Sequence, residues 1–546
     1  MKQLLYKWNI LLLITLLVLI FDELFLNLEL YKHLMFHIWA SPLSMTISYI
    51  AVVFIVELLS ILLLLSHRYI ASVLLILYTI IWLLDINYSL IGGDGFTFNE
   101  WKNIIDNSEF IVDGLTMYFS IKGFIYSLIV SLFWYFLYRY LRKKISYRLS
   151  IQDTVMVICI LLLIDFLVYH KIHKFKHYPT NLKVLHQIFV ASYCRGNILD
   201  RVEPKHLKID KSKSFPNIIF IVGESVRGDK LQINGFEKET TPYLVKHQSE
   251  IINLGLCVSS FTQSHESNMI MRTGIDMDII PDISHLHNTY EPLVFYAKKA
   301  GYYTMLLDAQ SNGITNGLRD VDKQWIDKIV GVDKLNCTIP YRDLTLIKEI
   351  VKVLNRKQKT FIHFNKYGSH FNYDDTYPRE FEFFKPTNLT RSSKNSNFKD
   401  KRLNSYYNSL RWGVDYFFKE LIERIKDKDV IVIYISDHGQ SLLEDINYKR
   451  THAGDKVEQS IVPLFIYVTP KAKDRLFSLY GKDFLKNKNK LSQFEIFPTI
   501  LKLLGVETTK LSLFDKIPKR DRYYFSPEGS IGELIFVKKH LFKYNI

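Results

Sequence analysis

NIIFIVGES (217–225) is an apolar run of strand length that ends in a glycine followed by polar side chains. VIVIYISDHG (430–439) repeats this design, and VPLFIYV (462–468) is a further candidate for a buried strand. Helical stretches lie between them, for example NSLRWGVDYFFKELIERI (408–425). Because alternating strands and helices form βαβ units, the pattern predicts an α/β domain with a largely parallel central sheet over residues 217–546.

Polar side chains follow two of the predicted strands, with Glu224 after the first and Asp437 and His438 after the second. Ligands collect at the carboxyl ends of parallel strands, so we expect these three side chains to lie together. Two carboxylates and an imidazole suit Zn²⁺ and leave a coordination position open for chemistry. The alternative is purely structural, with Asp437 capping a turn and His438 hydrogen-bonded nearby.

Two further histidines stand outside the predicted strands and helices. His370 lies in YGSHFNYDD and His452 in KRTHAGD. Such residues can donate hydrogen bonds to phosphate oxygens or bind a second ion. Either one alone is more often an ordinary surface residue, so they support a site only in combination with the strand-end cluster.

The first 170 residues differ in composition from the rest of the chain. Of the 546 residues, which correspond to several domains, 48% are hydrophobic and 23% are charged. Residues 1–170 contain 11 Lys and Arg against 12 Asp and Glu, whereas the remainder contains 59 against 43. The net charge of +15 therefore belongs to the second part. An anionic membrane surface or a phosphate-rich substrate accounts for it better than nucleic acid, which we do not expect as a partner.

Five segments of the first part approach the length of about 20 apolar residues that crosses a bilayer. They lie near residues 8–26, 44–66, 70–91, 122–141 and 152–169. Basic residues flank them at Lys2, Lys7, Arg68, Arg139, Arg142, Lys143, Lys144 and Arg148. The excess of Lys and Arg in cytoplasmic loops then predicts a cytoplasmic N-terminus. A cleaved signal peptide fits the first span poorly, because no small-residue cleavage site follows it.

Residues 1–170 are therefore predicted to be a transmembrane domain of five helices in a bacterial inner membrane. Everything after the fifth span lies on the outer face, which is the periplasm of a Gram-negative cell. Glu57, in the middle of the second span, indicates either a functional contact or a buried partner. FNEWKNIIDNSEF (98–110) has the pattern of a helix at the membrane interface, or it is only a connector. Residues 171–216 are predicted to be an amphipathic bridging segment that ends in a linker.

A set of motifs occurs in a specific order after the predicted spans. They are ESVRGD (224–229), NGF (234–236), ETTP (239–242), GSH (368–370), NSLR (408–411), DY (415–416), SDHGQS (436–441) and His452. In this order, the motifs resemble those of the bacterial phosphoethanolamine transferases of the alkaline phosphatase superfamily. The resemblance covers essentially the whole chain and implies a sulfatase-like periplasmic catalytic domain over residues 217–546.

This family uses a threonine nucleophile followed by Ser three residues later and by Ser or Thr nine residues later. Ser264 matches that position, because Ser267 and Thr273 follow it at these spacings. The serine is a departure from the family, but either hydroxyl is chemically competent. Thr262 remains a rival. Alternatively, the stretch is a polar loop whose hydroxyls cap a helix that begins near Met269.

The resemblance implies a double displacement. One tightly bound Zn²⁺, held by Glu224, Asp437, His438 and Ser264, assists attack of the serine on the phosphorus of phosphatidylethanolamine. The phosphoethanolamine then passes to an acceptor of the cell envelope, which is the lipopolysaccharide core, lipid A or another glycan. His370 and His452 are implied to bind phosphate oxygens or further ions, or to act as acid-base partners.

Two further comparisons with the family concern the lipid and the acceptor. Asn103 and Asn107 stand roughly where the family presents polar residues to the lipid headgroup. Members that modify lipid A carry several close cysteine pairs, whereas this chain has four cysteines, of which Cys159 lies in the fifth span. At most one disulfide is therefore expected among the others, Cys194, Cys257 and Cys337. Together with the serine nucleophile, this favours acceptors other than lipid A without excluding it.

Three alternatives compete with this interpretation. A lipoteichoic-acid-synthase-like phosphoglycerol transferase shares the spans and the domain, but the segment 227–242 and the SDHGQS motif argue against it. A sulfatase needs Cys or Ser followed by x-Pro-x-Arg, and no such sequence surrounds Ser264. A non-enzymatic, membrane-anchored envelope sensor that has lost its metal is disfavoured by the intact cluster of Glu224, Asp437, His438 and the hydroxyl of residue 264.

Overall fold

The structure is a computed structural model that describes residues 65–77, 80, 83, 121–144, 148–156, 158–159, 201, 203–204, 206–277, 290–314, 316–387, 398–444, 451–526 and 541–544. The chain forms two compact units, which are described separately here. The first comprises Met1–Gly196, Asp445–Arg450 and Gly529–Leu534, and the second comprises Asn197–Glu444, Thr451–Glu528 and Ile535–Ile546.

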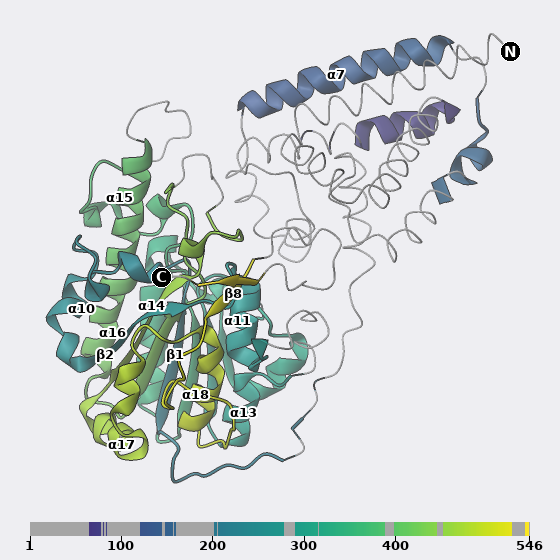
Figure 1. Cartoon of the computed structure of the whole chain (residues 1–546). Helices are drawn as coiled ribbons and strands as arrows, with labels where there is room; N and C mark the ends of the chain where they lie inside the picture. Colours follow the sequence, from purple (N-terminus) through teal and green to yellow (C-terminus); the bar gives the residue numbers. More distant parts are fainter. Residues whose placement is uncertain are drawn as a thin grey trace. The chain divides into compact units, whose positions relative to one another are not determined.

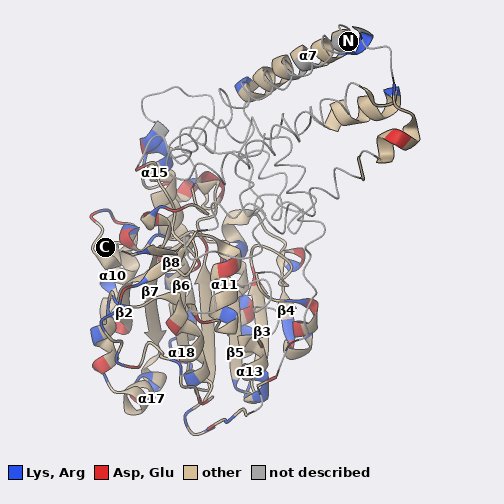
Figure 2. Cartoon of the chain, turned by 45° about the vertical axis from the view of Figure 1, so that its right-hand side comes forward, with Lys and Arg blue, Asp and Glu red and all other residues tan. Residues whose placement is uncertain are grey.

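In the first unit, helix α7 (Ile121–Lys144) covers the fourth predicted span (Figure 1). Within the described residues it is the one helix long and apolar enough to cross a membrane, over Ile121–Tyr140. Its charged residues lie toward its two ends (Figure 2). A shorter apolar helix, Arg68–Leu77, lies in the predicted third span. Several predicted features lie outside the described residues. They are the first span, Glu57, the interfacial segment, most of the second and fifth spans and part of the third.

The segment before the third predicted span contacts the segment after the fourth. The Arg142 guanidinium donates to the carbonyl oxygen of Ser66 at 2.7 Å. The backbone N–H of Leu149 donates to the carbonyl oxygen of Leu65 at 2.8 Å. The basic residues that flank these two spans are therefore at the same end of the described helices.

The second unit is built on a seven-stranded sheet in the order β2-β7-β6-β1-β5-β3-β4. Its strands are β1 (Asn217–Gly223), β2 (Ile251–Val258), β3 (Tyr303–Asp308), β4 (Lys328–Val330), β5 (Thr360–Asn365), β6 (Ile431–Ser436) and β7 (Ile461–Val468). Strand β7 is antiparallel to both neighbours, whereas the pairs among β6, β1, β5, β3 and β4 are parallel. The predicted α/β domain with a largely parallel sheet is thus confirmed. The predicted strand 462–468 lies in β7, which is antiparallel to its two neighbours.

Helices cover both faces of this sheet. One face packs against α13 (Leu293–Lys299), α17 (Pro470–Tyr480) and α18 (Ile496–Leu503), and the other against α14 (Arg342–Leu354), α15 (Phe398–Leu410) and α16 (Phe417–Ile425). Along β1, Ile218, Phe220 and Val222 enter one core while Ile219 and Ile221 enter the other. Because successive side chains of a strand point to opposite faces, a strand buried on both sides is apolar throughout.

The predicted helix over 408–425 is confirmed as one continuous segment. Helix α15 passes through a π-helical turn, Arg411–Tyr416, into α16. The carboxylate of Asp415 accepts hydrogen bonds from the backbone N–H groups of Tyr243 and Leu244 at 3.0 and 2.9 Å. These donors open the short helix α10 (Pro242–Lys246), so Asp415 caps a helix and is part of the scaffold.

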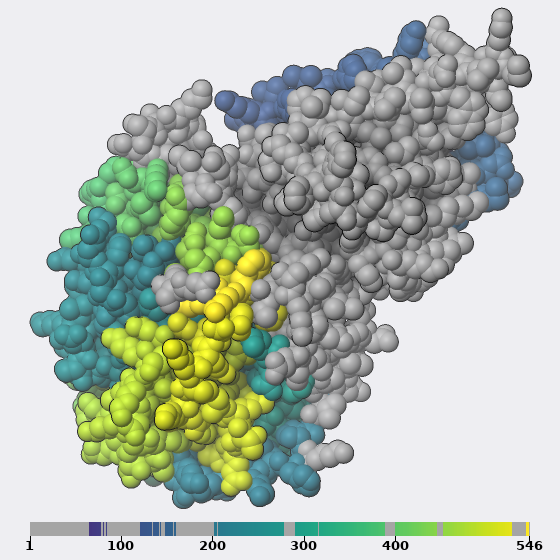
Figure 3. All heavy atoms as spheres, in the orientation of Figure 1, coloured from purple at the N-terminus to yellow at the C-terminus, as the bar shows by residue number. Residues whose placement is uncertain are grey.

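A short hairpin of β8 (Tyr523–Phe525) and β9 (Leu541–Lys543) lies beside the segment that precedes helix α11 (Ser264–Thr273). The N–H of Thr262 donates to the carbonyl of Phe525 at 3.2 Å, and the N–H of Phe525 donates to that of Ser260 at 2.9 Å. The yellow C-terminal residues lie on the surface of the face shown in Figure 3. The C-terminal hairpin thus helps to fix the approach to α11.

Candidate active site and metal centre

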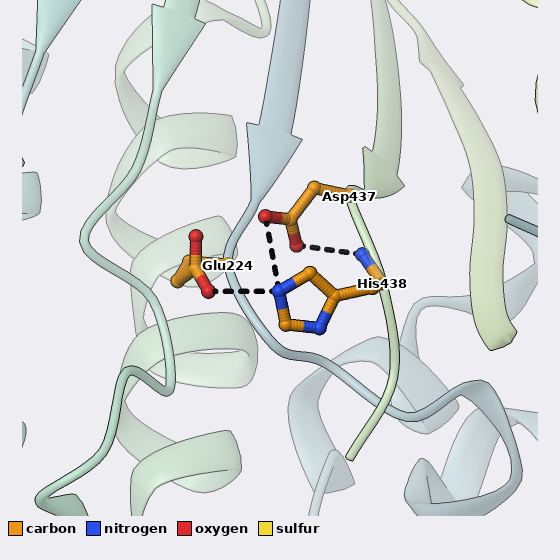
Figure 4. A group of neighbouring side chains, drawn as sticks. All are labelled: Glu224, Asp437 and His438. Carbon is orange, nitrogen blue, oxygen red and sulfur yellow. Dashed lines mark hydrogen bonds and ion pairs between the residues drawn. The ribbon is translucent and has the colours of Figure 1, made fainter. Parts of the chain in front are cut away.

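Glu224, Asp437 and His438 come together at the carboxyl ends of two adjacent strands. Glu224 follows β1 and the other two follow β6, which pairs with β1 in parallel so that Gly223 lies beside Ser436. One ligand atom from each of the three residues lies within 4.8 Å of the others. The imidazole Nε2 of His438 is 3.4 Å from Glu224 Oε1 and 3.6 Å from Asp437 Oδ2. Figure 4 shows both carboxylates directed at this nitrogen.

Backbone and hydroxyl donors hold the three side chains in place. Asp437 Oδ1 accepts from the N–H groups of Ser225, at 3.0 Å, and of His438, at 2.7 Å. The Ser225 hydroxyl donates to Glu224 Oε1 at 2.6 Å, and Ser225 has a left-handed φ of 60°. His438 Nδ1 lies 2.7 Å from the carbonyl oxygen of Gly439. That contact places a proton on Nδ1, so Nε2 is the nitrogen that faces the carboxylates and would bind a metal once its own proton is lost.

The electrostatics of this buried cluster favour a cation at its centre. Burial disfavours the charge on Glu224, but the hydrogen bond and charge of His438 hold the Glu224 pKa well below its usual value. Burial and the charge on Glu224 raise the pKa of Asp437 to about 7. Burial acts to lower the pKa of His438, but the two carboxylates outweigh it and raise this pKa to about 9. A metal ion would replace these retained protons.

The residues present fit a zinc ion. The Asp437 side chain is only 1% exposed, and its Oδ2 accepts no hydrogen bond in the described part of the chain. A buried carboxylate oxygen without a hydrogen bond is costly, and a bound cation would remove that cost. Two carboxylate oxygens and one imidazole nitrogen are a donor set that zinc accepts.

Ser264 is brought to this cluster and Thr262 is not. The Ser264 hydroxyl donates to Glu224 Oε2 at 3.1 Å and lies 3.1 Å from His438 Nε2. The Thr262 hydroxyl donates instead to the carbonyl oxygen of Gly454 at 2.7 Å and is fully buried. The predicted helix start near Met269 is wrong, because α11 already begins at Ser264. Ser264 is therefore the first residue of a helix, where backbone N–H groups favour negative charge.

Both histidines singled out in the sequence lie near the cluster. The ring of His452 stacks on that of His438, with 4.7 Å between ring centroids. His370 is close enough to Glu224 for its charge to help lower the Glu224 pKa. The GSH loop that carries His370 packs on the backbone of Glu224, since the Ser369 N–H donates to the Glu224 carbonyl at 3.0 Å. A Cβ on Gly368, which has a φ of +57°, would lie 2.7 Å from the Glu224 nitrogen.

Other predicted positions have a structural role or lie outside the described residues. Arg227 of the ESVRGD motif is ion-paired with Asp229 at 2.6 Å and with Glu444, and it donates to the carbonyl of Gln440 at 3.2 Å. It thereby ties the loop after β1 to the loop after β6. Asn103, Asn107 and Cys194 lie outside the described residues. Cys257 and Cys337 are free thiols, as is Cys159.

Sequence reasoning missed Gln310. Its side-chain amide donates to Glu224 Oε2 at 3.0 Å and to the carbonyl oxygen of Lys366 at 2.7 Å. The signal was present, because YTMLLDAQS (303–311) is another apolar run that ends in polar residues.

A family model described as Sulfatase matches residues 216–506. The chain belongs to the sulfatase family. The matched residues include the central sheet and the loops that follow β1 and β6. The match identifies the fold of the second unit and does not identify its reaction.

Several proteins similar to this chain are named phosphoethanolamine transferases. The chain is 28% identical over 323 residues to the Kdo(2)-lipid A phosphoethanolamine 7''-transferase of Escherichia coli (strain K12), over 58% of this chain and 53% of that protein. The chain thus spans about half the length of the curated relatives it matches. The resemblance inferred from the motifs is confirmed.

Solved structures share the fold. The integral membrane lipooligosaccharide phosphoethanolamine transferase A from Neisseria meningitidis superposes with a TM-score of 0.62 at 19% identity, covering 91% of this chain and 95% of that one. The C-terminal periplasmic domain of EcEptC from Escherichia coli, in complex with Zn, gives a TM-score of 0.52 at 20% identity, covering 63% of this chain and 96% of that one.

Proposed function

We propose that this protein transfers phosphoethanolamine from phosphatidylethanolamine to a glycolipid of the cell envelope. The observation that carries the proposal is the position of the Ser264 hydroxyl, 3.1 Å from both Glu224 Oε2 and His438 Nε2. A hydroxyl beside a buried cluster of metal-ligand type is the arrangement of an activated nucleophile. The named activity of the relatives supports phosphoethanolamine as the group transferred.

Glu224, Asp437, His438 and Ser264 would hold one tightly bound zinc ion. When bound, zinc supplies Lewis acidity that lowers the pKa of a hydroxyl and stabilises charge on a phosphoryl group. The zinc complex of the EcEptC domain, which shares this fold, supports zinc over other metals. His370 and His452 border the cluster, where they bind phosphate oxygens, recruit further ions or act as acid-base partners.

The chain's own residues carry out two displacements. In the first, Ser264 Oγ forms a bond to phosphorus and the bond from phosphorus to the diacylglycerol oxygen breaks. The serine proton ends on that oxygen, so diacylglycerol leaves and phosphoethanolamine-serine remains. In the second, a hydroxyl or phosphate oxygen of the acceptor displaces Ser264, which regains a proton. The positive end of helix α11 at Ser264 favours the charge that develops on the phosphoryl oxygens.

A five-span membrane domain brings this site to its lipid donor. We propose that residues 1–170 are this domain, 171–216 the amphipathic bridge and linker, and 217–546 the periplasmic catalytic domain of a multi-pass inner-membrane protein. The apolar helix α7 supports a membrane location. The contact of Arg142 with Ser66 supports a shared, cytoplasmic side for the basic residues beside both spans. Asn103 and Asn107 are proposed to face the lipid headgroup.

The acceptor is proposed to be the lipopolysaccharide core or lipid A. Both carry phosphate, which the basic second part of the chain would attract. The free thiols of Cys257 and Cys337 set this chain apart from the cysteine-paired enzymes that modify lipid A, which favours the core or another glycan.

Incubation of the purified full chain with labelled phospholipids tests the reaction. Phosphatidylethanolamine is expected to release diacylglycerol and to leave phosphoethanolamine on the protein. An adduct formed only from phosphatidylglycerol would instead identify a phosphoglycerol transferase. A protein that binds no zinc and forms no adduct would favour the non-enzymatic sensor.

A further inference from the structure

We infer that Gln310 is a positioning residue that fixes the carboxylate of Glu224 for metal binding, and this inference rests on the proposed function. Its side-chain Nε2 donates to Glu224 Oε2 at 3.0 Å and to the carbonyl oxygen of Lys366 at 2.7 Å. Glu224 follows β1 and Lys366 follows β5, the neighbouring strand. Gln310 follows β3, on the far side of β5. The amide therefore reaches across the end of one strand to hold a ligand on the next.

The position of Gln310 is itself fixed by a buried carboxylate at the end of β3. Asp308 Oδ1 accepts from the N–H groups of Gln310 at 2.9 Å and Ser311 at 3.1 Å, and from the Asn365 amide at 3.2 Å. Asp308 Oδ2 accepts from the Ser311 hydroxyl at 2.6 Å. Asp308 is 1% exposed. An Asp that accepts from the backbone N–H groups two and three residues ahead locks a tight turn, so the direction of residue 310 is set by the fold.

The opposite end of the bridge is equally fixed. The N–H of Lys366 donates to the carbonyl of Val222 at 2.9 Å. The buried Lys366 ammonium lies 2.8 Å from Asp343 Oδ2, and Asp343 also accepts from the N–H groups of Tyr367 and Gly368. Gln310 thus spans two rigid points, which lets a single amide hold Glu224 in one orientation.

An amide suits this position better than a charged side chain. It donates a hydrogen bond to the carboxylate without neutralising it, so the negative charge remains available to a cation. A lysine here would compete with the metal for Glu224. Metal ligands are oriented by such outer hydrogen bonds, and loss of one typically weakens metal affinity by about 10- to 100-fold.

Zinc binding by Gln310→Met tests the inference, because methionine keeps the volume and removes the amide. The dissociation constant for zinc, measured by chelator competition on the full chain, is expected to rise by about 10- to 100-fold. The melting temperature of the zinc-free protein is expected to stay close to that of the wild type. Gln324→Met is the matched control, since Gln324 is exposed and donates to the nearby carbonyl of Val321. Its zinc affinity is expected to be unchanged.

A double-mutant cycle separates positioning from general damage. If Asp308 acts through Gln310, then Asp308→Asn weakens zinc binding in the wild type but adds little in Gln310→Met. Wild-type zinc affinity in Gln310→Met, with transfer activity lost, would overturn the inference and assign Gln310 to the substrate. That result would leave the proposed function intact. A wild-type chain that binds no zinc would overturn the metal centre itself, and the inference with it.

Discussion

The hydroxyl of Ser264 donates to the carboxylate of Glu224 across 3.1 Å, although 40 residues separate the two in the chain. Glu224 ends the central strand β1 and Ser264 begins helix α11. The contact unites the proposed nucleophile with a proposed metal ligand.

Ser264→Ala is expected to abolish the phosphoethanolamine adduct, because in the described part of the chain its hydroxyl is the one seen to contact both Glu224 and His438. Thr262→Val is expected to retain it, at a stability cost of about 1 kcal/mol for the lost hydrogen bond to the Gly454 carbonyl. Mass spectrometry of the protein after exposure to phosphatidylethanolamine measures both. An adduct on Ser264→Ala that disappears in Thr262→Val would reverse the assignment.

Asp437→Asn is expected to lower zinc occupancy. Loss of a hydrogen bond to a metal ligand weakens zinc affinity by about 10- to 100-fold, and loss of the ligand's own charge is expected to weaken it more. The substitution keeps the shape of the side chain but removes the charge of an oxygen that has no hydrogen-bond partner. Metal content after dialysis against a weak chelator provides the measurement. Asp429→Asn is the control, because Asp429 lies two residues before β6, at the end of the strand opposite to Asp437. Equal zinc in Asp437→Asn and the wild type would remove Asp437 from the site.

Zinc affinity is expected to strengthen as the pH rises from about 6 to about 9. The pKa of His438 is raised to about 9 and that of Asp437 to about 7, so below these values zinc must displace protons. Between pH 9 and pH 7 each pH unit therefore costs up to about tenfold in affinity, and below pH 7, where Asp437 also holds a proton, up to about a hundredfold. Competition titrations across this range test the sign. An affinity that falls with rising pH, in a buffer that does not bind zinc, would contradict the proposed ligand set.

Gly368→Ala is expected to cost both stability and zinc. A Cβ at this position meets the Glu224 backbone at 2.7 Å, and the φ of +57° is itself unfavourable for alanine. Gly235→Ala is the matched control, because Gly235 is left-handed, with φ 97° and ψ 11°, and has open space around it. Denaturant unfolding is expected to show a loss of about 1 kcal/mol for the control and more for Gly368→Ala. Equal losses would mean that the GSH loop does not constrain Glu224.

Much of the site could be predicted because its ligands follow long apolar strands. NIIFIVG and IVIYIS are buried on both faces, and polar residues after such strands gather at one edge of the sheet. The direction of β7 could not be predicted, since an apolar run carries no information about its orientation. The start of α11 was missed because SHESN is polar and has weak helix propensity, whereas tertiary contacts hold it in a helix. Gln310 was missed because an uncharged amide marks no chemistry until a turn aims it at Glu224.

Mass spectrometry of the envelope glycolipids tests the central claim most directly. Cells that produce the wild-type chain are compared with cells that produce Ser264→Ala at the same level, and the glycolipids are fragmented to locate any added group. We expect phosphoethanolamine on the lipopolysaccharide core or lipid A in the wild-type cells only. Identical glycolipids in the two strains, with the wild-type protein folded and loaded with zinc, would contradict the proposed transferase.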